Sequence, residues 1–141
     1  MESHKRPPVG PEEAFARAFI LPAKRARFIQ FLANPRRRQE VLDRLGHGLP
    51  VIPELAREVP GPQDFPLELE KLLRGLGAGD GCHVIAYGLK ADGKAMPLRD
   101  ALNLVCMSEH GAILCCVPGR LAYYKPESPA PGVLLELRPV T

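Results

Sequence analysis

The chain has 141 residues, of which 45% are hydrophobic and 25% are charged, and its formal net charge at pH 7 is +3. This length and composition suit one folded domain with a substantial core, and they argue against a chain that is disordered throughout. No apolar run approaches the roughly 18–20 residues that a membrane-spanning helix requires, and the N-terminal segment lacks the apolar centre of a signal peptide. We therefore expect a cytoplasmic protein without a membrane segment.

The first half of the chain carries helical patterns. Residues 1–10 are polar and contain two adjacent prolines, so we expect a disordered tail there. A proline followed by two glutamates at 11–13 favours a helix start, and Pro22 must kink that helix or restart it. Beyond this point apolar residues recur at helical spacing. The patterns predict helices over 11–21, 23–33, 35–45 and 66–76, and a short helix over 54–59 in the proline-rich segment 49–66.

The second half carries strand patterns and turn signals. The almost wholly apolar run 82–89 predicts a buried strand, and Asp92-Gly93 is a strong signal for a hairpin turn. Residues 132–138 alternate in polarity, which is typical of a half-exposed edge strand. The other predicted elements are strands over 94–96, 112–117 and 120–125 and a helix that begins at Pro97.

These elements predict an α+β fold, because helices come first and strands later, whereas a doubly wound sheet would alternate them. We expect three to four N-terminal helices packed on a C-terminal, mostly antiparallel sheet of four to five strands that carries one inserted helix. Residues 11–141 would form a single domain. Its helical part would span 11–77 and its α+β part would span 80–141.

The most unusual feature of the sequence is a basic stretch at 23–44. It contains seven basic and two acidic side chains, a net charge of +5, so the rest of the chain sums to −2. Asn34-Pro35 suggests a helix start, and the three arginines that follow would lie at the positive end of the helix dipole, where bases reduce stability. Such a local conflict suggests a nearby anion or acidic partner. The candidate anion-binding residues are Lys24, Arg25, Arg27, Arg36, Arg37 and Arg38.

The partner of this stretch is left open by the sequence. Nucleic acid or an acidic protein would be bound through residues 24–38, because arginine side chains suit phosphate and carboxylate groups. The alternative is a solvated helix face in which Arg36 pairs with Glu40 one turn later. No helix-turn-helix, zinc-finger or RNA-recognition signature in the sequence accompanies the basic residues.

A second candidate surface follows the turn at Pro118-Gly119. Neighbouring residues of a strand face opposite sides, so at least one of two adjacent tyrosines should reach the surface. Flanking basic residues would complete a patch suited to a partner. The alternative is an amphipathic pair at a sheet edge, with both hydroxyls in water. The candidate patch residues are Arg120, Tyr123, Tyr124 and Lys125.

The cysteines do not form a recognisable metal or catalytic motif. They are Cys82, Cys106, Cys115 and Cys116, and we expect reduced thiols in apolar surroundings. Cys106 and His110 have the spacing of two ligands on one helical turn, but a zinc site needs at least three placed ligands. A catalytic thiol would need a basic, partly exposed setting beside His83 or His110. We therefore predict no metal, no cofactor and no catalytic residue.

These observations favour a small, non-enzymatic binding or regulatory module whose basic helical surface takes an anionic partner. Two alternatives remain open. One is a small enzyme that uses cysteine and histidine from the segment 82–116. The other is an adaptor, or a homodimer subunit, that pairs with another chain through the predicted edge strand at 133–137.

Overall fold

The fold is an antiparallel sheet between two layers of helices. The computed structural model describes residues 10–59, 65–127 and 130–137, and this part of the chain contains six strands in one sheet. The helices are α1 (Pro11–Phe19), α2 (Pro22–Ala33), α3 (Arg38–Arg44), α4 (Pro66–Gly75) and α5 (Leu98–Met107), with a 3-10 turn at Pro53–Leu55. The strands are β1 (Ala56–Glu58), β2 (Gly81–Ala86), β3 (Ala95–Pro97), β4 (Ala112–Val117), β5 (Leu121–Lys125) and β6 (Val133–Glu136). The predicted α+β class is confirmed, and α5 is the predicted inserted helix.

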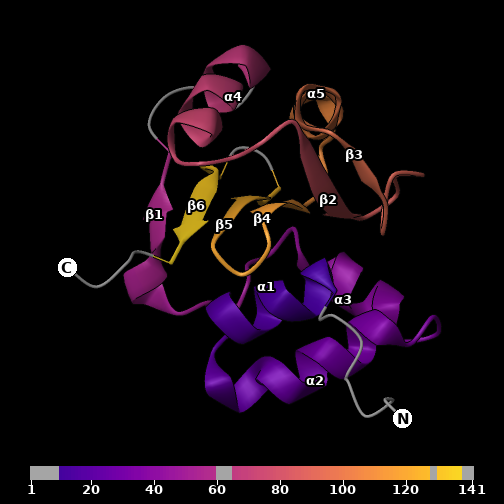
Figure 1. Cartoon of the computed structure of the whole chain (residues 1–141). Coiled ribbons are helices and arrows are strands. Elements are labelled where there is room, and N and C mark those ends of the chain that lie inside the picture. Colours follow the sequence, from indigo (N-terminus) through magenta and orange to yellow (C-terminus); the bar gives the residue numbers. More distant parts are fainter. Residues whose placement is uncertain (1–9, 60–64, 128–129, 138–141) are drawn as a thin grey trace, which may run out of the picture.

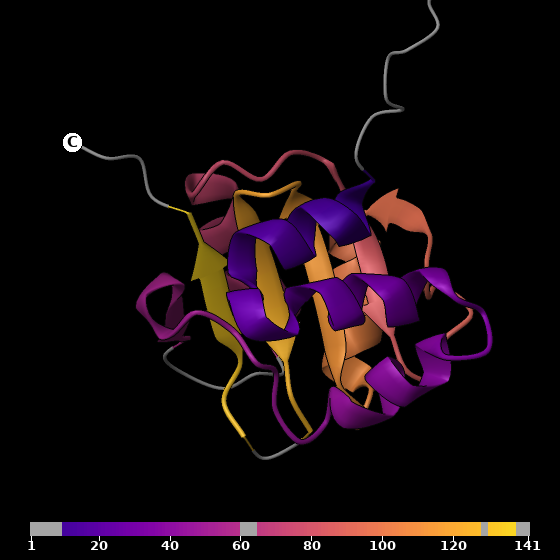
Figure 2. The same cartoon turned by 90° about the horizontal axis from the view of Figure 1, so that it is seen from below.

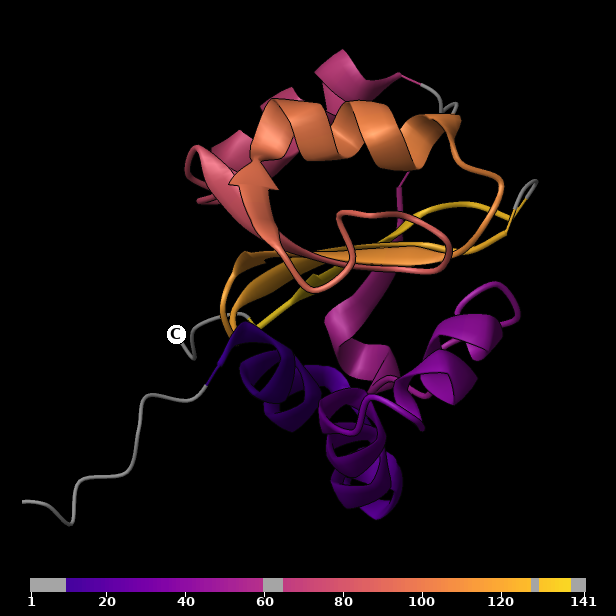
Figure 3. The same ribbon diagram turned by 90° about the vertical axis from the view of Figure 1, so that its right-hand side faces the viewer.

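The helices divide between the two faces of the sheet. Figure 1 shows α4 and α5 above the strands and α1, α2 and α3 below them. The same three layers appear from the side in Figure 3, and Figure 2 shows α1 and α2 crossing the lower face. The strand order is β1-β6-β5-β4-β2-β3, and neighbouring strands run antiparallel. Because both faces are covered, the central strands are buried on both sides.

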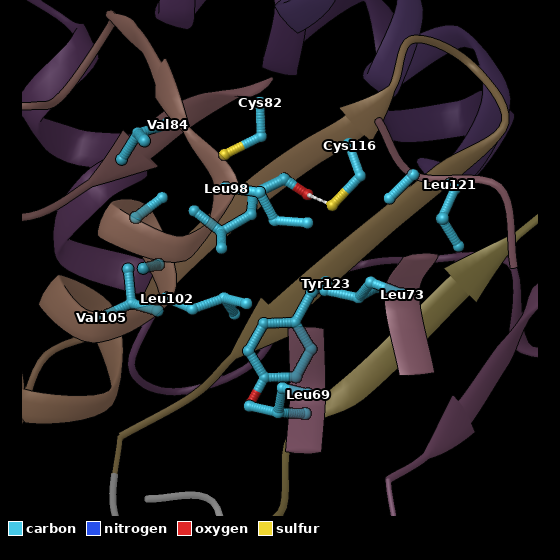
Figure 4. Close-up of a cluster of buried hydrophobic side chains, with 14 of the residues drawn as sticks. Leu69, Leu73, Cys82, Val84, Leu98, Leu102, Val105, Cys116, Leu121 and Tyr123 are labelled. Carbon is cyan, nitrogen blue, oxygen red and sulfur yellow. Dashed lines mark hydrogen bonds between the residues drawn. The ribbon is translucent and has the colours of Figure 1, made fainter. Parts of the chain in front are cut away.

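This double burial explains why the central strands lack alternating polarity. Side chains of a strand alternate between the two faces of its sheet. In β4, Ile113 and Cys115 belong to the core under α1–α3, while Leu114 and Cys116 belong to the core under α4 and α5. Figure 4 shows the second core, in which the Tyr123 ring lies among leucine and valine side chains. A sheet with one wet face would instead have required polar residues at every second position.

The segment predicted as a helix over 54–59 is the edge strand β1 instead. Ala56, Arg57 and Glu58 pair with Leu135, Leu134 and Val133 of β6. A helix of this length, bounded by prolines, has too few hydrogen bonds to offset its nucleation cost. Pairing with β6 satisfies the same backbone groups, so the sheet has one strand more than the upper limit predicted.

The prediction that 133–137 forms a sheet edge is wrong. Strand β6 pairs with β1 on one side and with β5 on the other. The two edges are formed by β1 and β3, each of which has three residues. Short edge strands offer few unpaired backbone groups to another chain. The proposed homodimer through β6 therefore has no exposed edge to use.

The predicted helix start at Asn34-Pro35 is a turn. The Asn34 side chain accepts a hydrogen bond from the backbone N–H of Arg36 at 2.9 Å, and the backbone carbonyl oxygen of Asn34 accepts bonds from the N–H groups of Arg37 and Arg38. Helix α3 then begins only at Arg38. Asparagine favours such turns because its side chain can bond the backbone two residues later. The delayed start places Arg36 and Arg37 before the helix rather than within its first turn.

Candidate anion-binding site

The structure separates the six predicted anion-binding residues into two groups. Arg38 and Arg25 are directed to partners within the protein, whereas Lys24, Arg27, Arg36 and Arg37 are exposed. Arg25 donates from Nη2 to the carbonyl oxygen of Ile20 at 3.1 Å and is partly buried. This contact provides a hydrogen-bond donor for a carbonyl group at the end of α1 that has no partner within the helix. Arg25 therefore has a structural role.

Arg38 lies at the centre of an internal ion-pair network. It donates two hydrogen bonds to the Glu12 carboxylate, at 2.7 and 2.8 Å, and two to that of Asp92, both at 2.9 Å. Its side chain is only 18% exposed. Paired fork contacts of this kind are the strongest that arginine makes with carboxylates. The prediction that Arg38 is an anion-binding surface residue is therefore wrong, because its anions are supplied by α1 and the β2–β3 loop.

A pocket between α2, α3 and the loop at 48–50 is lined by three exposed members of the basic stretch: Lys24, Arg27 and Arg44. We call this the α2–α3 pocket; it has a volume of about 340 Å³. Its buried lining includes Phe28, Val41 and Leu45. The charged residues that line it are exposed and lie at its mouth: Lys24, Arg27, Glu40 and Arg44. Three cations and one carboxylate thus surround an apolar floor.

The one carboxylate at the mouth is already paired. Glu40 accepts hydrogen bonds from Nε of Arg37 at 2.5 Å and from Nη2 at 3.3 Å. The hydrogen bond from Arg37 lowers the pKa of Glu40, and nearby Arg44 and Arg27 add to the effect. Among the described residues, Lys24, Arg27 and Arg44 make no ion pair with a carboxylate. The mouth therefore retains a local excess of positive charge.

Phe31 links the basic residues of α2 to those before α3. The guanidinium carbon of Arg37 lies 4.1 Å from the centre of its ring, and that of Arg27 lies at 5.0 Å. Both distances fall within the range of cation–π attraction. These contacts hold two arginines close together despite their like charge. They also occupy ring surface on which a nucleic-acid base would otherwise stack.

Arg44 is the residue that the sequence-based list of site residues lacks. It belongs to the last turn of α3 and reaches the pocket mouth from the side opposite α2. The available signal was its charge within the stretch 23–44 together with its position one turn after Glu40. Arg36 is exposed but does not line the pocket.

The second predicted surface patch is wrong for three of its four residues. Tyr123, Tyr124 and Lys125 are 1%, 5% and 2% exposed, and only Arg120 lies at the surface. The reason is the helical cover on both faces of β5, which leaves neither side of the strand in water. The Tyr124 hydroxyl donates to the carbonyl oxygen of Leu45. Lys125 donates from Nζ to the carbonyl oxygen of Ser108 at 2.7 Å, and burial lowers the pKa of this lysine.

Most of the described cysteine and histidine side chains are buried or already engaged by other groups. Burial raises the pKa of Cys82 to about 11 and that of Cys116 to about 12, and it also raises the pKa of Cys115. His83 is engaged by Glu12 at 2.8 Å, and His110 packs edge-on against Tyr87. In the described ranges no three His, Cys, Asp or Glu side chains are placed to hold a metal ion. A thiolate is disfavoured at Cys82, Cys115 and Cys116, because burial penalises the charged form of each.

This arrangement predicts low thiol reactivity. Ellman's reagent at neutral pH should modify at most one of the four cysteines rapidly, and the half-buried Cys106 is the one expected to react. Cys82, Cys115 and Cys116 should react only after denaturation, because burial both blocks the reagent and suppresses the thiolate. Mass spectrometry of peptides labelled before and after denaturation would identify each residue. Rapid native labelling of any of the three buried thiols would contradict the structure and revive the enzyme hypothesis.

Comparison with protein-family models, with curated proteins and with solved structures finds no match to this chain. Across the described residues, no helix combines the length and the apolar character that crossing a bilayer would require.

Proposed function

We propose that the protein is a binding module that takes an anionic partner at the α2–α3 pocket. The observation that supports this proposal is the grouping of Lys24, Arg27 and Arg44 at one mouth, where the only carboxylate is occupied by Arg37. Arginine and lysine in such a group can bind carboxylate or phosphate oxygens directly. Under this proposal the exposed cations bind a partner, whereas in the alternative they form only a solvated helix face.

The positions of Lys24, Arg25 and Arg27 lower the stability of helix α2, and this loss of stability supports a functional role for the basic residues. Lys24 and Arg27 are one turn apart on α2, and like charges at this spacing destabilise a helix. The first turn of α2 contains no acidic residue, while Lys24 and Arg25 lie near its positive end. A bound anion would offset both effects. Local sequence choices that oppose stability are expected mainly where a function requires them.

The proposal predicts salt-sensitive binding that depends on the pocket cations. Fluorescence anisotropy should detect binding of an acidic peptide or a single-stranded RNA at low salt, and the affinity should fall about tenfold between about 50 and about 300 mM NaCl. The triple variant Lys24→Glu, Arg27→Glu, Arg44→Glu should lose this binding, because it replaces every cation at the mouth. Circular dichroism would check that the variant remains folded.

A matched control separates the site from the overall charge. The variant Lys71→Glu, Lys90→Glu, Arg120→Glu changes the net charge equally at three exposed positions outside the pocket. It should retain most of the binding. Equal loss in both triple variants would show that only the net charge matters, and absence of binding of every anionic probe at low salt, the small acid described below included, would refute the proposal. Preference for RNA over peptide would identify nucleic acid as the partner, although the arginines over Phe31 disfavour base stacking.

A further inference from the structure

The apolar interior of the α2–α3 pocket identifies a narrower class of ligand than its charge does. We propose that the pocket binds a small amphiphilic acid, meaning one carboxylate joined to an apolar or aromatic body. This inference rests on the proposed function, because it assigns the same cations to the acid group. It adds that the apolar body enters the pocket and contributes to affinity.

The lining provides separate places for the two parts of such a ligand. Phe31, Leu49 and Pro50 are half-buried and present apolar surface to the pocket, and Phe28 and Val41, each 8% exposed, complete its apolar lining. A purely electrostatic site for a polyanion would need only the exposed cations. Burial of apolar ligand surface against this lining would itself favour binding. The cations at the mouth would then fix the orientation of the acid group.

The size of the pocket favours a small ligand. Its volume of about 340 Å³ lies at the lower end of the roughly 300–1,000 Å³ that is usual for small-molecule sites. A protein partner would need roughly 800 Å² of surface on each side, with an apolar centre. The large hydrophobic side chains exposed in the described part of the chain lie elsewhere, at Phe65, Leu67, Leu104, Met107 and Leu137. None of these exposed hydrophobic side chains lines the pocket, whose lining combines apolar and basic groups.

A set of three probes tests each part of the ligand. Isothermal titration calorimetry would compare 2-naphthoate, its neutral analogue 2-naphthamide, and acetate, which lacks the apolar body. We expect 2-naphthoate to bind at least about tenfold more tightly than either of the others, a difference of the size that one charge-assisted contact provides. Equal affinity for the amide would overturn the proposal, because the cations would then play no part.

Two variants of α2 test whether the ligand occupies the pocket. Ala23 is exposed and lines the pocket, whereas Ala26 is exposed on the same helix and does not. Ala23→Phe should fill the pocket and weaken 2-naphthoate binding by about tenfold or more, while Ala26→Phe should leave it unchanged. Both changes leave the basic residues in place. Unaltered binding in Ala23→Phe would overturn the proposal by placing the ligand elsewhere.

The outcomes separate this inference from the proposed function. If the acidic peptide or RNA binds in a salt-sensitive manner and 2-naphthoate does not bind, the inference fails and the proposed function stands. If neither class binds, both fail. A hexapeptide with a phenylalanine between acidic residues provides the remaining comparison. Tighter binding of that peptide than of 2-naphthoate would replace the small acid with a protein segment and overturn the inference.

Discussion

Replacing Arg38 with methionine should lower the free energy of unfolding by about 3 kcal/mol. The substitution leaves the carboxylates of Glu12 and Asp92, which are 20% and 19% exposed, close together without the cation that both contact. Removal of one member of a buried ion pair costs about 3–5 kcal/mol, and partial exposure places this network at the lower end. Urea denaturation of the variant and the wild type would measure the difference.

The exposed pair Arg37–Glu40 provides the control. Both side chains are 45% exposed, so Arg37→Met should cost well under about 1 kcal/mol. A loss as large as that of Arg38→Met would contradict the distinction between the two arginines. Similar small losses in both variants would show that the Arg38 network contributes little.

The pH dependence of stability provides a second readout for Arg38. Burial opposes ionisation of Glu12, but hydrogen bonds from Arg38 and His83 outweigh it and lower the pKa from 4.5 to about 2. A carboxyl group whose pKa is lower in the folded state stabilises the protein above the unfolded value. This stabilisation should be lost as the pH falls from about 5 to about 2. In Arg38→Met the loss over that range should be smaller, because the native pKa returns toward the ordinary value.

Gly111→Ala should destabilise the protein by about 3 kcal/mol. A β-carbon at Gly111 would meet the carbonyl carbon of Leu45 and would lie 2.6 Å from its oxygen and 2.7 Å from the nitrogen of Gly46. These are backbone atoms at the end of α3, so they cannot rotate away as a side chain would. Overpacking of this kind typically costs about 1–3 kcal/mol, and the backbone contact puts this case at the upper limit. Thermal and urea denaturation would both report it.

Gly79→Ala is the matched control for this prediction. No atom lies within 4 Å of a β-carbon built at Gly79, and the backbone there is not in the left-handed region. Its free energy of unfolding should change by less than about 0.5 kcal/mol. If Gly111→Ala were equally neutral, the close approach of α3 to β4 would have to be relaxed in solution.

Local patterns in the sequence predicted most individual elements of the fold. The apolar spacing over 66–76 corresponds to α4, and the apolar runs at 82–89 and 112–117 correspond to β2 and β4. The failures fall where local preference is weak. The short segment before Val59 becomes a strand only because β6 is available as its partner. No pattern within six residues contains that information, since strand pairing is a long-range contact.

The sequence predicted the positive charge of the candidate site, but not which residues form it. Sequence located the basic stretch, and four of its six proposed residues remain exposed. Arg38 was assigned to the surface because its partners are distant in the chain: Glu12 is 26 residues away and Asp92 is 54. Likewise, the exposure of Tyr123 and Tyr124 depended on which faces of β5 are covered. That depends on the N-terminal helices α1–α3 on one face and on α4 and α5, from the middle of the chain, on the other.

Local patterns predict the α+β class, most of the helices and strands, and the excess of positive charge between residues 23 and 44. These follow from apolar periodicity, turn residues and composition, all of which act locally. The internal pairing of Arg38, the strands at the two edges of the sheet and the cations around the α2–α3 pocket emerge only when the chain has folded. Ion pairing, strand order and pocket shape require groups from distant segments to meet, and their energies depend on burial that exists only after the layers have packed.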